Sequence, residues 1–144
     1  MEEQNYAKHT MWVPLYHFIL PPFVLFALAG SIYNLVRAMG NGSGRLAAGI
    51  LVALSFVGAV LFYYARAFPL KAQDRVIRTE ENLRHFGMTG KLLDKRLSVK
   101  QIIALRFASD GEFVALAQKA ADSGMSPADI KKAVKTWRPD NDRM

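Results

Sequence analysis

The sequence predicts an all-α fold: a two-helix transmembrane hairpin, an amphipathic juxtamembrane helix and a small C-terminal three-helix bundle. Three observations support it. Two long runs carry no formal charge, the run that follows them interleaves apolar and charged residues, and three serine-led helix starts then recur at short intervals. The expected boundaries are 1–13 for an N-terminal tail, 14–65 for the hairpin, 66–90 for the juxtamembrane helix and 91–144 for a cytoplasmic helical domain.

The second uncharged run, residues 46–65, gives the stronger membrane signal. A helix rises about 1.5 Å per residue, so this run spans about 30 Å, the thickness of a bilayer hydrocarbon core. Arg45 and Arg66 bracket the run, and Tyr63 and Tyr64 stand near its end as residues of an aromatic belt would. A helix of a soluble protein would normally keep a polar stripe, which this run lacks. We therefore expect a transmembrane helix here.

The first uncharged run begins at Pro14 and predicts a helix over about 14–38. Pro21 and Pro22 interrupt the run, and because each lacks a backbone donor, the helix is expected to kink or to start afresh there. The link to the second run, residues 37–45, is short and rich in glycine, which makes the two helices antiparallel neighbours. The leader is acidic and no small-residue cleavage pattern follows, which argues against a cleaved signal peptide.

Small residues recur at four-residue spacing on both predicted helices. Such spacing lets membrane helices approach closely and pack. The candidate packing residues are Ala27, Gly30, Ser31, Ser55, Gly58 and Ala59.

His17 is an ionisable residue inside the first run. One interpretation is a side chain that sits at the interface or bonds a neighbouring backbone group. The other is an axial ligand to haem or chlorophyll, because an ionisable group in a membrane span is a functional hypothesis by default. The partner helix offers no second histidine, so the first interpretation is favoured and no cofactor is expected elsewhere.

The net charge of +7 is unevenly distributed. Residues 66–106 hold ten Lys/Arg against four Asp/Glu, whereas residues 107–144 hold six of each. A basic excess beside a membrane suits anionic lipid headgroups. The candidate headgroup contacts are Arg66, Lys71, Arg75, Arg78 and Arg84. Six basic residues flank the spans on the side of the two termini and two flank them in the loop, which predicts both termini on the cytoplasmic side of the membrane.

The juxtamembrane stretch has a narrow apolar seam among charged residues. Leu70 and Ile77 are seven residues apart, as are Val76 and Leu83, which is the spacing of a coiled-coil face. The seam would either pack on the chain's own domain or receive a helix of a partner. Because the stretch contains fewer than three heptads, the pattern does not favour one of these two interpretations over the other.

Three serines each stand three residues before an acid or amide side chain, a pattern typical of a capping box. The pairs are Ser98 with Gln101, Ser109 with Glu112 and Ser126 with Asp129. Gly124 is placed to end the middle helix in the left-handed conformation. The last helix would bury Ile130, Val134 and Trp137 on one face. A compact bundle with a marginal core follows.

Several stretches together resemble a family of small bacterial membrane proteins of unknown function, DUF6526. They are EQNYAKH at 3–9, HF at 17–18, KAQDRVIRTEENLR at 71–84, QIIALRFASDGEF at 101–113 and PADIKKAVKTWRPD at 127–140. The resemblance implies a hairpin followed by a helical cytoplasmic region and carries no activity. Gly111 stands where an acidic residue is usual in the family, which affects a helix cap and no inferred chemistry.

The sequence favours a non-catalytic role. It has no cysteine, no glycine-rich phosphate loop and no zinc-protease motif, and a nucleophile with a base cannot be assembled. The leading hypothesis is an accessory or scaffolding subunit of a larger respiratory, photosynthetic or transport complex, in contact with other membrane subunits, with copies of itself and with anionic lipid. Alternatives are a homo-oligomer and a membrane-tethered lipid- or nucleic-acid-binding module.

Nucleic-acid binding is the weakest of these alternatives. Residues 117–137 have the pattern of a helix, a short turn and a second helix, which is typical of DNA-binding helix–turn–helix motifs. Lys131, Lys132, Lys135 and Arg138 are predicted on or near one side of the last helix. Most basic helical faces are simply solvated, however, and the C-terminal third is electrically neutral.

Overall fold

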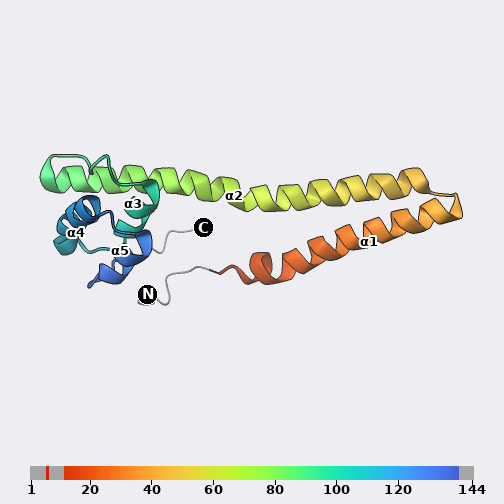
Figure 1. Cartoon of the computed structure of the whole chain (residues 1–144), viewed down its shortest axis with the longest axis horizontal. Coiled ribbons are helices and arrows are strands. Elements are labelled where there is room, and N and C mark those ends of the chain that lie inside the picture. Colours follow the sequence, from red (N-terminus) through yellow and green to blue (C-terminus); the bar gives the residue numbers. More distant parts are fainter. Residues whose placement is uncertain (1–5, 7–11, 140–144) are drawn as a thin grey trace. The chain divides into compact units, whose positions relative to one another are not determined.

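The computed structural model describes residue 6 and residues 12–139. It contains a π-helix η1 (Leu15–Ile19) followed by five α-helices (Figure 1). These are α1 (Leu20–Asn41), α2 (Arg45–Thr89), α3 (Val99–Leu105), α4 (Asp110–Ser123) and α5 (Pro127–Ala133). The described residues form no strand beyond a one-residue antiparallel bridge between Ala108 and Trp137. The all-α prediction is confirmed.

The chain divides into two compact units. One is Trp12–Phe68, called the N-terminal unit below. The other contains residues 69–139, called the C-terminal unit below. Helix α2 contributes its first half to the N-terminal unit and its second half to the C-terminal unit.

The helix passes through the two prolines of the first run without the predicted fresh start, and its hydrogen-bond pattern changes just before them. Pro21 and Pro22 cannot donate to the carbonyls of His17 and Phe18, which a continuous α-helix would pair with them. The preceding turn widens into η1, and the Leu20 N–H donates to the Leu15 carbonyl instead. Helix α1 then runs without interruption to Asn41.

Glycines end α1 and make the turn to α2. Gly42 and Gly44 have φ of 75° and 72°, a left-handed conformation that residues with a Cβ rarely adopt. The Gly42 N–H donates to the Ala38 carbonyl over 3.2 Å, and Arg45 Nη2 donates to the Met39 carbonyl over the same distance. The predicted glycine-rich turn is therefore present.

Helix α2 is one element of 45 residues, whereas the sequence analysis divides it at residue 65 into a span and a juxtamembrane helix. Pro69 lies inside it. A single proline removes one hydrogen bond, and Ala65, Ala67 and Ala72 around it are strong helix formers, so the helix continues. It ends at Gly90, whose φ is 71° and whose N–H donates to the Phe86 carbonyl over 2.7 Å.

The C-terminal unit has a core made by α3, α4 and α5 with the chain that leads into them. Its buried members are Leu93, Leu97, Ile102, Ala104, Leu105, Ala108, Phe113, Leu116, Ala117, Ala120, Ile130 and Val134. Trp137 packs on this core, and its ring centroid lies 4.8 Å from that of Phe107. Burial of these apolar side chains is the main force that holds the three short helices together.

Two of the three predicted capping boxes work as helix caps. Ser98 accepts from the Gln101 N–H, and the Gln101 side chain accepts from the Ser98 N–H over 2.8 Å. Ser126 accepts from the Asp129 N–H over 3.1 Å. The prediction is wrong for Ser109, whose side chain makes no cap bond to the backbone of α4. Gly124 ends α4 with φ 60° and ψ 37°, as expected.

The last helix is shorter than predicted. Helix α5 ends at Ala133, and Val134 is extended with φ −65° and ψ 121°. Ile130 and Val134 are buried, but Trp137 reaches the core through the bridge to Ala108 and not from a helical face. The Ser109 N–H donates to the Thr136 carbonyl and the Arg138 N–H to the Phe107 carbonyl, which holds this segment in extended form.

Candidate functional site

Arg84 is the centre of the ion-pair cluster that fastens α2 to the rest of the C-terminal unit. Its Nη1 lies 3.0 Å from Glu81 Oε2, and its Nε lies 2.9 Å from Asp110 Oδ1. Its Nη2 donates to the Ala108 carbonyl over 2.7 Å, and its guanidinium carbon lies 4.2 Å from the Phe113 ring centroid. The arginine therefore ties α2 to the start of α4 by charge, hydrogen bonds and stacking.

This geometry gives Arg84, one of the predicted lipid-headgroup contacts, partners inside the C-terminal unit, while the headgroup contact itself stays a prediction. Its side chain is only 10% exposed, and Glu81 beside it is 7% exposed. The bonds to the two carboxylates and the carbonyl use four of the five guanidinium N–H groups, so the main role of Arg84 in this structure is to hold α2 against α4. The sequence showed Arg84 as one more cation in a basic stretch, because its main partner, Asp110, lies 26 residues away.

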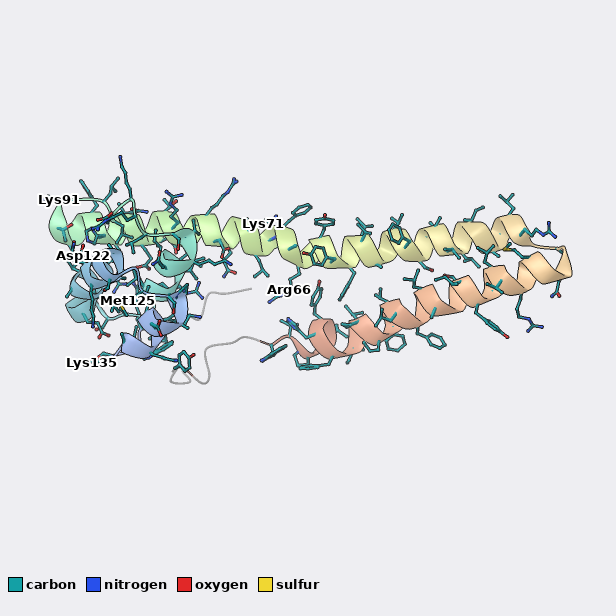
Figure 2. The ribbon with its side chains drawn as sticks, viewed as in Figure 1. Arg66, Lys71, Lys91, Asp122, Met125 and Lys135 are labelled. Carbon is teal, nitrogen blue, oxygen red and sulfur yellow. The ribbon has the colours of Figure 1, made fainter. Side chains whose placement is uncertain are left out.

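The other four predicted headgroup residues also lie on α2, and Figure 2 marks two of them, Arg66 and Lys71. Arg66 is half-buried in the N-terminal unit, with its guanidinium carbon 5.7 Å from the Tyr16 ring centroid. Lys71, Arg75 and Arg78 are exposed. Those three remain available to an anionic partner.

A second long-range contact near Arg66 joins η1 to α2. The Tyr16 hydroxyl donates to the Phe62 carbonyl over 2.6 Å, and the two rings stack with centroids 4.6 Å apart. The carbonyl that accepts this bond is four residues before Arg66. No local pattern in the sequence signals this pair, because 46 residues separate the partners.

The small-residue positions divide between two faces of the helices. Ser31 is buried and donates to the Leu28 carbonyl over 2.8 Å, while Ser55 and Ala59 are half-buried. Ala48 is 1% exposed and was missed, although it precedes Ser55 by seven residues. The remaining candidates lie on exposed faces: Ala27, Gly30 and Gly58.

The less exposed positions of α1 and of the first half of α2 recur at helical spacing. On α1 they include Val24, Leu28, Ser31, Leu35 and Ala38, and on α2 Ala48, Val52, Ser55, Ala59 and Phe62. Each set steps by three or four residues, so it forms one face of its helix. The opposite faces carry large apolar side chains in the open, with Phe26 78% and Leu46 79% exposed.

His17 lies against its own backbone. Its Nδ1 is 2.9 Å from the Val13 carbonyl oxygen and 3.1 Å from the Val13 nitrogen, and the Trp12 ring packs edge-on against it. This is the arrangement that the favoured interpretation expects. Among the described residues, no group of three or more His, Asp or Glu side chains is placed to hold a metal ion.

The four seam residues of the second half of α2 do not share one environment. Ile77 is buried in the C-terminal unit at 6% exposure. Leu70 is 38% exposed, Val76 55% and Leu83 69%. The chain's own domain therefore takes one position of the seam, and the others stay open.

A groove of about 710 Å³ runs beside that open part of α2. Its lining combines basic, polar and apolar side chains from α2 and from the segment after it. These are Arg75, Arg78, Thr79, Asn82, Leu92, Leu93, Asp94, Lys95, Leu97 and Ile102. The Leu93 N–H donates to Asn82 Oδ1 over 3.2 Å, which fixes the segment against the helix and forms the floor of the groove.

Asp94 in this groove is already paired. Arg96 contacts it over 2.7 Å and also reaches Asp122 of α4 over 2.9 Å. The hydrogen bonds from Arg96 lower the pKa of the Asp94 carboxyl to about 2. Asp94 is therefore a carboxylate at neutral pH whose charge Arg96 offsets.

Glu112 explains why α5 is short. Its carboxylate accepts the Lys135 N–H over 3.1 Å and the Thr136 N–H over 3.0 Å. Those two amides would continue α5 if they bonded to carbonyls four residues back, so their capture by Glu112 favours the extended segment after Ala133. The same carboxylate is the one that the sequence analysis assigned to a capping box with Ser109.

The predicted basic face of a recognition helix is consequently not formed. Lys131 and Lys132 lie on α5, but Lys135 and Arg138 come after its end. Lys131 is half-buried, with its ammonium 5.6 Å from the Phe107 ring centroid. A helix of seven residues rises about 10 Å, which leaves little length for reading a groove of DNA.

Glu112→Gln is expected to lower the stability of the C-terminal unit by about 1–2 kcal/mol at pH 7, because one amide loses a charged acceptor. Partial burial raises the pKa of the Glu112 carboxyl, but hydrogen bonds from Lys135, Thr136 and Ser109 outweigh it, and that pKa lies below 4.5. A lowered pKa stabilises the fold above pH 4.5, and this stabilisation is lost as the pH falls through the folded-state pKa. Urea denaturation at several pH values should show the difference between wild type and variant shrinking below pH 4.5; a constant difference would contradict the assignment.

The model of a protein family described as a family of unknown function, DUF6526, matches residues 1–144, so the chain belongs to that family. The search of curated proteins found no match. The search of solved structures likewise found none.

Proposed function

We propose that this member of the DUF6526 family is an integral membrane protein that serves as a non-catalytic accessory or scaffolding subunit of a larger bacterial membrane complex. In this proposal α1 and the first half of α2 cross the bilayer as a hairpin. The C-terminal unit then stands on the cytoplasmic side as a surface for other subunits. Respiratory, photosynthetic and transport complexes are the candidate assemblies.

The observation that carries the proposal is the exposure of two long apolar helices. The segments Leu15–Asn41 and Arg45–Thr89 contain windows with mean hydropathy of 1.8 and 2.3, and only 6% of each window is buried inside the chain. Length and composition suffice for each to cross a membrane. In water, so large an exposed apolar surface would drive association or aggregation, whereas lipid hydrocarbon covers it without cost.

The contacts of the N-terminal unit support a hairpin. The small side chains of Ser31, Ala48 and Ala59 lie on the less exposed faces, where close approach of helices needs them. The Tyr16 hydroxyl donates a hydrogen bond to the Phe62 carbonyl of α2. This hydrogen bond stabilises the hairpin more in lipid than in water, because no water competes for the donor or the acceptor. The exposed faces carry phenylalanine, leucine and valine, as a lipid-facing surface does.

The proposed orientation predicts which parts of the chain an external reagent reaches. The protein has no cysteine, so single cysteines can be introduced without background. With both termini inside, Ser43→Cys in the turn should react with a membrane-impermeant maleimide on intact cells. Lys119→Cys on the exposed face of α4 should react only after permeabilisation. Labelling of Lys119→Cys on intact cells would show that the topology is the reverse of the proposed one.

A scaffolding role is supported by how the charged groups of the C-terminal unit are used. Arg84, Glu112 and Arg96 each tie one segment to another, and each is satisfied by partners within the unit. Charged groups engaged in this way hold a shape and are not poised for proton transfer to a substrate. These features suit a unit that presents a binding surface to other subunits better than one that carries a reaction centre.

Native purification tests the accessory role. The full chain, tagged at its C-terminus and expressed at its natural level, is extracted from membranes in mild detergent and sized by light scattering. Co-purification of other membrane proteins in fixed ratio is the expected result. A monodisperse monomer without partners would overturn the proposal, and a particle of this chain alone would replace it with the homo-oligomer.

A further inference from the structure

The groove beside α2 continues into an apolar stripe that nothing in the described part of the chain covers. Val76, Thr79, Leu83 and Phe86 follow one another by three or four residues and so share a face of α2. Val76 is 55% exposed, Leu83 69% and Phe86 50%. Thr79 belongs both to the stripe and to the groove, so the two surfaces are continuous.

Leu92 extends the apolar surface from the other wall of the groove. It is 66% exposed, although the leucines next to it in the sequence and at position 97 are buried in the core. A large aliphatic side chain held on a rigid segment in the open is typical of an interaction site. Stripe and groove together have the form that receives an amphipathic helix, with anchors at three- and four-residue spacing.

The charges around this surface are mainly basic. Arg75, Arg78 and Lys95 line the groove, and no ion pair in the described ranges engages any of them. Asp94 is the acidic member of the lining, and Arg96 offsets it. The electrostatic complement of such a surface is a row of carboxylates beside an apolar face.

We propose that this surface docks an acidic amphipathic helix of another subunit, with its apolar face on the stripe and its carboxylates against Arg75, Arg78 and Lys95. The inference rests on the proposed accessory function and specifies the chemistry of the partner. A second copy of this chain would place the same cations against one another.

A peptide-binding experiment tests the complementarity. The full chain is placed in nanodiscs of phosphatidylcholine, and two fluorescent designed helical peptides are titrated, one with glutamates flanking a leucine face and one with glutamines instead. We expect the glutamate peptide to bind at least tenfold more tightly and Arg75→Glu/Arg78→Glu to weaken it about tenfold. The exposed control Lys119→Glu should leave the affinity unchanged. Equal affinity for both peptides, no binding, or insensitivity to the charge reversal would overturn the proposal.

Photo-crosslinking from position 92 in native membranes identifies the occupant. A benzophenone amino acid in place of Leu92 should form an adduct with an acidic, apolar-faced segment of another protein. Adducts with lipid or with a second copy, or no adduct at all, would refute the docking proposal. If partners still co-purify in those cases, the accessory role stands and only the docking surface is wrong.

Discussion

Arg84→Met is expected to destabilise the C-terminal unit by about 3–4 kcal/mol. The substitution keeps much of the side-chain volume but leaves the Glu81 carboxylate, 7% exposed, without its cation. A buried charge that loses its partner costs far more than the pair contributes. Asp110, whose side chain is 74% exposed, can turn to solvent, so the cost arises mainly at Glu81. Urea denaturation followed by Trp137 fluorescence in a Trp12→Phe background measures it.

The double variant Glu81→Leu/Arg84→Met provides the control. Removing both charges leaves no uncompensated carboxylate, and leucine fills much of the space, so the double variant should be more stable than Arg84→Met alone by about 2 kcal/mol or more. If the two variants are equally unstable, the loss comes from the missing stacking on Phe113 or the missing bond to the Ala108 carbonyl. Our assignment of the cost to Glu81 would then be wrong.

Phe113→Ala is expected to cost about 3–5 kcal/mol, which is enough to unfold a small unit of this kind. The Phe113 side chain is fully buried, and it supports both the core and the Arg84 guanidinium that lies over its ring. Removal leaves a cavity at the point where α2 meets α4, and also deprives the arginine of its stacking surface. The same fluorescence assay, together with hydrogen exchange at α3 and α4, should report the loss.

Leu92→Ala is the matched control for this second prediction. Both substitutions shorten a large apolar side chain, but Leu92 is 66% exposed and lies outside the core. Its replacement should change stability by less than about 0.5 kcal/mol. A comparable loss in the two variants would mean that the core does not have the extent described.

Local sequence patterns predicted the helices and most of their ends well. The prolines at 21 and 22, the glycines at 42, 44 and 124, and the caps at Ser98 and Ser126 act through backbone groups within about four residues of themselves. Such effects can be read from a sequence because the partners stand next to one another. The all-α class predicted from these patterns is confirmed, and so is the family that the resemblance of the quoted stretches implied. The membrane hairpin and the cytoplasmic position of the bundle stay predictions.

Where a local pattern had a distant competitor, the prediction failed. Ser109 and Glu112 have the spacing of a capping box, yet the Glu112 carboxylate binds the amides of Lys135 and Thr136, 23 and 24 residues away. The carboxylate is drawn to these distant amides and keeps only a 3.5 Å contact with the Ser109 hydroxyl, so α4 has no side-chain cap at Ser109 and α5 ends early. The expected division at residue 65 is not a helix end, and even Pro69 does not interrupt α2, because one missing hydrogen bond is small against a long helix.

The sequence by itself determined the type and the polarity of each segment. These segments are two long apolar helices, a basic stretch that follows the second of them, and three short helices that each have one apolar face. Only the tertiary structure decided which cations are free and which are used. Arg84 and Arg78 look alike in the sequence, but Asp110, Ala108 and Phe113 enclose the first and leave the second at an open groove. Charge and hydropathy belong to a residue type, whereas burial depends on partners more than twenty positions away that only folding brings together.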